Sequence, residues 1–161
     1  MVVVAHNERV PQEFTDFLRD VEPRLRQALV STYGPIDGRE ATVDALSWAW
    51  EHWDRLAGVD NRVGYLYRVG QSATRRFATR PLPVDLSSTP DASRPELTPE
   101  LLQALAQLSE QQRTVVVLVH GYGWPQAEVA TLLEVGPSTV HEHLHRAMAR
   151  LRADLEDHDD R

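Results

Sequence analysis

The spacing of apolar side chains predicts helices in the first part of the chain. Residues 11–33 repeat apolar positions every three or four residues, which is the period of an α-helix. A turn follows at Gly34, and Asp37 with Glu40 three residues later matches a capping box. We therefore expect a second helix over about 38–57.

The same spacing predicts which faces of the next two helices are buried. The helix over 38–57 is expected to bury Val43, Leu46, Trp50 and Trp53. Its other face would then carry Asp44, Trp48, Glu51 and Arg55. A helix over about 61–79 is expected to bury Val63, Leu66, Gly70, Ala73 and Phe77.

The middle of the chain separates these helices from a second helical group. Residues 80–99 hold five prolines among serine and threonine, which indicates an extended linker. Residues 110–152 then predict three short helices, the last two joined by a tight turn, as in a helix-turn-helix. We expect an all-α fold of two small helical domains. The first domain is expected over 9–80 and the second over 99–156. A linker over 81–98 joins them, and an acidic tail over 157–161 follows.

Prolines and an apolar stripe define the final two helices. Pro125 suits the first turn of a helix over 125–133, and Pro137 after Gly136 suits the start of the last helix. One stripe of that last helix holds Val140, Leu144, Ala147 and Leu151, which we expect in the core. The opposite side presents Ser138, Glu142, His145 and Ala149, flanked by Thr139, His141 and Arg146.

This polar side has two interpretations from its pattern alone. In a helix-turn-helix it would meet DNA, where Glu142 could accept a hydrogen bond from cytosine N4 although a carboxylate repels phosphates. An amphipathic helix that only closes a bundle would show the same pattern. His141 and His145 lie one turn apart, but no third ligand stands at an obvious position, so we expect no metal.

Composition removes several classes of function. The net charge of −7 argues against a general polyanion binder, yet residues 61–80 carry five arginines and no acid. The chain has no cysteine, and no nucleophile–base pair or glycine-rich phosphate loop stands out, so neither an enzyme nor a cofactor is expected. No apolar run approaches the roughly 20 residues of a membrane span, and the opening lacks a signal peptide. We expect a cytoplasmic protein without membrane insertion.

The motifs of both domains resemble bacterial extracytoplasmic-function sigma factors. ALAQLSEQQRTVVVLVHGYGWPQAEVATLLEVGPSTVHEHLHRAMARLR (104–152) resembles region 4, most specifically in its ALxxLxxxQR opening and LHRAMARLR ending. DGREATVDALSWAWEHWDRL and RVGYLYRVGQSATRRF (37–77) resemble region 2. The resemblance implies a subunit that binds core RNA polymerase and directs it to promoter DNA. Region 2 would contact the −10 element and the polymerase clamp, and region 4 the −35 element and the flap.

The resemblance implies roles for particular residues. Contacts with DNA near the −10 element fall on Arg62, Tyr65, Arg68, Ser72, Arg75 and Arg76. Contacts with the −35 element fall on Ser138, Thr139, His141, Glu142, His145 and Arg146. Contacts with the polymerase fall on Asp44, Trp48 and Glu51. Arginines there would contact phosphates, and the tyrosine could stack on an unpaired base.

Departures from the family pattern keep a second hypothesis open. Histidines and Glu142 replace basic and small polar residues of the recognition helix, and Glu134 replaces the usual glycine of the turn. The acidic tail could also fold back on the arginines. The chain could therefore be a sigma-like regulator that acts mainly through protein contacts, by sequestering an anti-sigma factor, with weak or no DNA binding. An anti-sigma factor is a candidate partner under either hypothesis.

Overall fold

The computed structural model describes residues 4–75 and 98–159, with side chains for 12–75 and 98–157, and no strand occurs among them. The first lobe comprises α1 (Val4–Tyr33), α2 (Pro35–Glu51), α3 (Trp53–Leu56) and α4 (Arg62–Thr74). The second lobe comprises α5 (Pro99–Gln107), α6 (Glu110–Val116), the π-helix η2 (Val117–Gly121), α7 (Gln126–Leu133) and α8 (Pro137–Asp159). The all-α prediction is confirmed. Most of the predicted linker, the end of the predicted third helix, Arg76 and Phe77 lie outside the described residues.

Small side chains let the helices of the first lobe approach closely. The buried face of α2 holds Gly38, Ala41, Thr42, Ala45 and Ala49. A Cβ atom on Gly38 would stand 2.5 Å from the Cα of Val30, so the backbones of α1 and α2 are nearly in contact. A Cβ atom on Gly70 of α4 would stand 2.8 Å from the Leu29 side chain. Glycine and alanine thus set the spacing of the three long helices.

This packing contradicts half of the buried face predicted for the helix over 38–57: Leu46 and Trp53 are half-buried against the core as predicted, but Val43 and Trp50 are not. Val43 and Trp50 are 62% and 51% exposed, and Trp48, predicted on the polar face, is half-buried against the core. The prediction placed the large apolar side chains inside. The structure instead turns the small side chains toward α1, because only they permit the backbone contact at Gly38.

The start and end of α2 also differ from the prediction. The helix begins at Pro35 with Gly34 as N-cap and no side-chain cap, so the capping box expected from Asp37 and Glu40 is absent. Proline at the first helical position loses no hydrogen bond, and Gly34 adopts a φ of 86° that glycine tolerates. The helix ends at Glu51, and the short α3 follows instead of a continuation to residue 57.

The second lobe follows its predicted pattern more closely. Ser109 and Gln112 form a capping box at α6, and Thr98 caps α5. The Gly136 carbonyl accepts hydrogen bonds from the backbone N–H groups of Thr139 and Val140, as expected for the residue that opens α8. Pro125 is the N-cap of α7 and not its first helical residue, a shift of one position.

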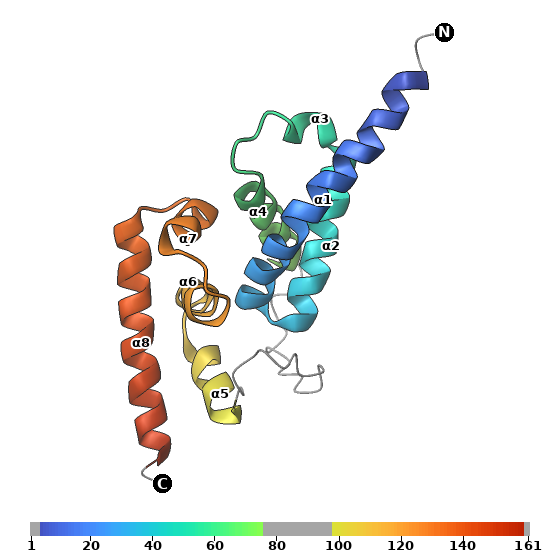
Figure 1. Ribbon diagram of the computed structural model, residues 1–161. Helices are drawn as coiled ribbons and strands as arrows, with labels where there is room; N and C mark the ends of the chain where they lie inside the picture. Colours follow the sequence, from blue (N-terminus) through green and yellow to red (C-terminus); the bar gives the residue numbers. More distant parts are fainter. Residues whose placement is uncertain (1–3, 76–97, 160–161) are drawn as a thin grey trace.

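The apolar stripe of α8 faces the core of the second lobe as predicted. Val140, Ala147 and Leu151 are buried and Leu144 is half-buried. The helix continues to Asp159, which carries its acidic end away from α4, in contrast to the fold-back considered for the acidic tail (Figure 1). Of the helices in the described ranges, none combines the length and apolar character needed to cross a bilayer.

The two lobes pack directly against each other. In Figure 1, α6 lies between α8 on one side and α1 on the other. One apolar cluster includes Leu25, Leu29 and Leu66 of the first lobe and Val115, Leu118 and Val129 of the second. The lobes predicted as separate units therefore share a core in this closed arrangement.

Candidate nucleic-acid interface and the contact between the lobes

The cationic side of the first lobe is built on α4. Asn61 fixes the start of this helix, because its Oδ1 accepts a hydrogen bond from the backbone N–H of Gly64 at 3.0 Å. Arg68, Ser72 and Arg75 follow at intervals of four and three residues and are exposed on one face. The predicted grouping of these three side chains on the outer side of the helix is confirmed.

Two of the described arginines on this helix already have partners within the chain. Arg62 is half-buried, donates from Nη2 to the Ala57 carbonyl at 3.3 Å, and lies about 6 Å from the Phe17 and Trp53 ring centres. Arg68 forms an ion pair with Glu134 of the second lobe. The Ser72 hydroxyl donates to the Arg68 carbonyl at 3.0 Å. In this arrangement the predicted DNA-facing side is thus partly occupied.

Aromatic contacts connect α2 with α4. Trp48 stacks on His52 with ring centres 4.4 Å apart, and its ring centre lies 5.3 Å from that of Tyr65. Trp48 is therefore not the lone aromatic on a polar face that the sequence predicts. It supports Tyr65, whose ring is itself half-buried.

The outer surface of α2 carries both acidic and apolar side chains. Asp44 and Glu51 are exposed, as predicted for polymerase contacts. Sequence reasoning missed the exposed apolar row of Ile36, Val43 and Trp50. Their spacing of seven residues places them on one side of a helix, and this spacing could have revealed the row from the sequence. The Trp50 ring makes an edge contact with Phe14, at 4.9 Å between ring centres.

The polar side of α8 is open to solvent. Ser138, His141, Glu142, His145 and Arg146 are exposed and Thr139 is half-buried. Arg146 forms an ion pair with Glu142 one turn earlier, which offsets the negative charge at the centre of this side. Among the described residues, no group of three or more potential metal ligands comes together.

The inner contact between the lobes is a buried cluster of hydroxyl groups. Thr32 Oγ1 lies 2.8 Å from the Tyr67 hydroxyl and 2.7 Å from Thr114 Oγ1. Arg113 donates from Nη2 and Nε to the Thr32 carbonyl at 2.8 and 3.2 Å. Tyr33 donates to Glu110 Oε1 at 2.7 Å beside this cluster. Residues from α1, α4 and α6 are thus joined by hydrogen bonds.

Burial changes the acid–base behaviour of this inner contact. Removal from water raises the pKa of Tyr67 and the pKa of Tyr33, and the nearby Glu110 carboxylate acts in the same direction on both. Burial lowers the pKa of Arg113, and Glu110 opposes that effect. The neutral tyrosines are therefore favoured by the closed arrangement.

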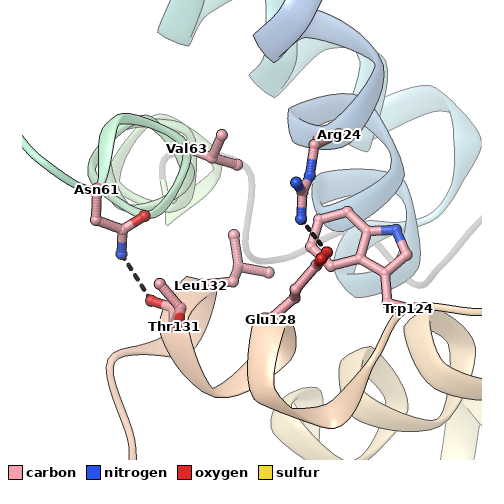
Figure 2. Close-up of a pocket in the computed structure, with 7 residues that line it drawn as sticks. All are labelled: Arg24, Asn61, Val63, Trp124, Glu128, Thr131 and Leu132. Carbon is pink, nitrogen blue, oxygen red and sulfur yellow. Dashed lines mark hydrogen bonds and ion pairs between the residues drawn. The ribbon is translucent and has the colours of Figure 1, made fainter.

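The outer contact between the lobes runs along α7 and is less well packed. Arg24 pairs with Glu128, Asn61 Nδ2 donates to the Thr131 carbonyl at 2.6 Å, and Arg68 pairs with Glu134. A cavity of about 200 Å³ opens here between the lobes (Figure 2). It is lined by Arg24, Asn61, Val63, Trp124, Glu128, Thr131 and Leu132. Figure 2 shows the Arg24–Glu128 pair and the Asn61–Thr131 bond on two sides of that cavity.

Comparison with known proteins supports a single family. The family model described as "Sigma-70, region 4" matches residues 99–151, from the start of α5 to Leu151 within α8. An RNA polymerase sigma-E factor of Streptomyces avermitilis is 33% identical over 97% of this chain and 91% of its own length. The chain belongs to the extracytoplasmic-function sigma factors.

Other sigma factors extend the similarity. The ECF RNA polymerase sigma factor SigL of Mycobacterium tuberculosis is 28% identical to this sigma factor over 82% of each chain. The sigma factor RpoE of Bartonella quintana, solved with the anti-sigma factor NepR, superposes with a TM-score of 0.65 at 21% identity, covering 90% of this chain and 98% of its own. CnrH, solved with the cytosolic domain of CnrY, gives 0.62 at 24% identity, covering 91% and 90%. These two structures share the fold.

Proposed function

We propose that this sigma factor directs core RNA polymerase to promoters, with α4 at the −10 element and α8 at the −35 element. The observation that carries the proposal is the exposed polar side of α8, held at the second position of a helix-turn-helix by a buried apolar stripe. The proposal includes a division into residues 9–80 and 99–156 joined by 81–98, with 157–161 as an acidic end. It also includes action in the cytoplasm without enzymatic activity.

On α8, the Glu142–Arg146 pair gives the polar side a defined chemistry. Arg146 reduces the repulsion between the Glu142 carboxylate and DNA phosphates, so the carboxylate could accept a hydrogen bond from cytosine N4. Ser138, Thr139, His141 and His145 would add polar contacts on either side. This face would then discriminate among bases more through Glu142 than through phosphate attraction.

On the first lobe, the arginines would contact phosphates and Tyr65 would contact a base. Arg68 is exposed on α4 and Arg75 is exposed at its C-cap, seven residues further on, while Arg62 is held by its own lobe. Tyr65 is the candidate for stacking on an unpaired base, and Trp48 behind it would fix its position. Asp44 and Glu51 remain the proposed polymerase contacts on α2, with Trp48 supporting that surface.

In the closed arrangement, the chain cannot contact both promoter elements at the same time. The −10 and −35 elements lie about 25 base pairs apart, which is about 85 Å at 3.4 Å per base pair. In this structure α4 contacts α7, and α7 contacts α8. Promoter binding therefore requires the lobes to separate.

Run-off transcription with core polymerase on a library of genomic promoters tests this function. We expect promoter-dependent transcripts that require the chain. Replacing Arg75 with alanine should lower promoter affinity and reduce the slope of log affinity against log salt by about 0.9, because one phosphate contact is lost. Arg19→Ala, an exposed arginine of α1, is the matched control and should leave the slope unchanged. An absence of promoter-dependent transcripts across the library would refute the proposal.

A second candidate function is the sequestration of a protein partner. Of the solved structures with this fold, CnrH is a complex with the cytosolic domain of CnrY, and the sigma factor RpoE is a complex with the anti-sigma factor NepR. We propose a partner of that class for this chain as well. A chain that acts only by sequestering such a partner would bind DNA with a flat salt dependence and support no transcription.

A further inference from the structure

One side of α7 reaches the first lobe at three regularly spaced positions. Glu128, Thr131 and Glu134 stand three residues apart, at the start, in the last turn and at the C-cap of this helix. Glu128 pairs with Arg24 of α1, the Thr131 carbonyl accepts from Asn61 at the start of α4, and Glu134 pairs with Arg68 within α4. The supporting helix of the helix-turn-helix is thereby held along the first lobe.

Glu134 has a backbone conformation that side chains disfavour. Its φ of 54° and ψ of 44° are left-handed, and it is the only non-glycine residue with a positive φ among the described residues. Glycine takes this helix-ending position without steric penalty. A carboxylate kept in a costly conformation, and paired with a specific arginine, indicates that the side chain has a function there.

The pairing of Glu134 with Arg68 resembles the pairing of an arginine with DNA. A guanidinium group binds a carboxylate and a phosphate by the same charge-assisted hydrogen bonds. The side chains of Arg68 and Glu134 are 53% and 44% exposed, so this ion pair is accessible to water and ions. Such a pair is weak and sensitive to salt, as an exchangeable contact must be.

We propose that Glu134 is an internal competitor of DNA phosphate: in the closed chain it occupies Arg68, so the turn of the helix-turn-helix inhibits the −10 helix. This inference rests on the proposed function, because it requires Arg68 to contact promoter DNA. Separation of the lobes withdraws Glu134 and releases Arg68 together. Opening the chain and freeing Arg68 are then the same event.

The buried hydroxyl cluster offers a way to hold the lobes closed. The chain has no cysteine, and the side-chain oxygens of Thr32 and Thr114 lie 2.7 Å apart in the core. Sulfur atoms at these two positions would be separated by a distance close to the disulfide bond length of about 2.05 Å. The double variant Thr32→Cys with Thr114→Cys should therefore crosslink α1 to α6 under oxidation and release on reduction. Failure to crosslink would contradict the closed arrangement, and with it the inference.

The crosslinked chain separates the inference from the proposed function. We expect oxidation to reduce run-off transcription and promoter DNA binding at least about tenfold, because the open, binding-competent population is removed. Reductant should restore both, and each single-cysteine variant should be indifferent to oxidant. Equal activity of the crosslinked and reduced chains would overturn the inference and the requirement that the lobes separate, but promoter-dependent transcription by this chain would still stand. Inactivity of the reduced and unmodified chains alike would overturn the function itself.

A pair of charge-removing variants tests the role of Glu134. Glu134→Gln should raise the affinity of the full chain for a promoter fragment opened at the −10 element about two- to fivefold at low salt. Glu128→Gln is the matched control, because it removes an equal charge from the same side of α7 without freeing Arg68. The difference between the two variants should vanish in an Arg68→Ala background. An equal gain from both variants, or a Glu134 gain that persists without Arg68, would overturn the inference.

Discussion

The inner and outer contacts between the lobes differ in burial and in chemistry. At the inner contact, α6 places Thr114 and Val115, both fully buried, against α1 and α4, and Arg113 bonds the end of α1. At the outer contact, α7 offers ion pairs that are about half exposed beside a cavity. A buried aliphatic side chain contributes about 2–5 kcal/mol by truncation, whereas an exposed ion pair contributes about 0.2–1 kcal/mol. The inner contact therefore holds the lobes together, and the outer contact determines which side chains are covered.

The largest effect should come from the apolar part of the shared core. Leu118 is fully buried in the cluster that joins both lobes, so Leu118→Ala should lower the free energy of unfolding by about 2–5 kcal/mol. Val43→Ala, on the exposed side of α2, should change it by less than about 0.5 kcal/mol. Urea unfolding followed by circular dichroism measures both. Similar losses for the two variants would mean that Leu118 is not part of a buried core.

Alkaline pH should weaken the inner contact next. Burial raises the pKa of Tyr67 in the folded chain, so the stability from its neutral form is complete below its ordinary pKa of about 10. Above that pH the unfolded chain loses the proton first, and stability should fall by about 1.4 kcal/mol per pH unit for this tyrosine. Urea midpoints between pH 9 and 11 measure the fall. Tyr67→Phe should make it shallower, and an unchanged slope in that variant would contradict the assignment to Tyr67.

Removing only the Tyr67 hydroxyl at neutral pH should have a smaller effect. Thr32 and Thr114 remain within hydrogen-bonding distance of each other, and each hydroxyl has a carbonyl of its own helix as an alternative acceptor for its one proton. We expect Tyr67→Phe to cost about 1 kcal/mol of unfolding free energy. A cost above that of Leu118→Ala would show that the hydroxyl groups, and not the apolar cluster, dominate the inner contact.

The smallest effect should come from the outer contact. Glu128→Gln removes one ion pair while leaving Arg24 above the Trp124 ring, 4.6 Å from its centre. We expect a loss of at most about 1 kcal/mol at low salt and none near 1 M salt, where exposed charges are screened. Glu142→Gln, which breaks a pair within α8 alone, provides the comparison. A loss that persists at high salt would show that Glu128 acts through packing.

The helix-turn-helix was the most predictable part of the molecule. Pro137 and Gly136 mark the start of α8, and the stripe from Val140 to Leu151 follows a simple helical period. Those signals are local, because each depends on neighbours within one or two turns. The polar side of α8 could therefore be predicted residue by residue from its position opposite the stripe.

The first lobe and the lobe contact were less predictable for a physical reason. Large apolar residues dominate a periodicity, but α2 packs through Gly38 and its alanines and leaves Val43 and Trp50 outside. The partner of Arg68 lies 66 residues further along the chain, beyond the linker. No local spacing connects Arg68 with Glu134, so the pairing of these two side chains could be learned only from the fold.

The side chain of Asn61 performs two tasks at once. Its oxygen caps α4 at Gly64, and its nitrogen bonds the Thr131 carbonyl of α7. Both bonds use one rigid amide plane, so rotation of that plane to suit one partner disturbs the other. The NMR signals of this one side-chain NH₂ group would consequently report both on docking of the helix-turn-helix and on fraying of the first turn of α4.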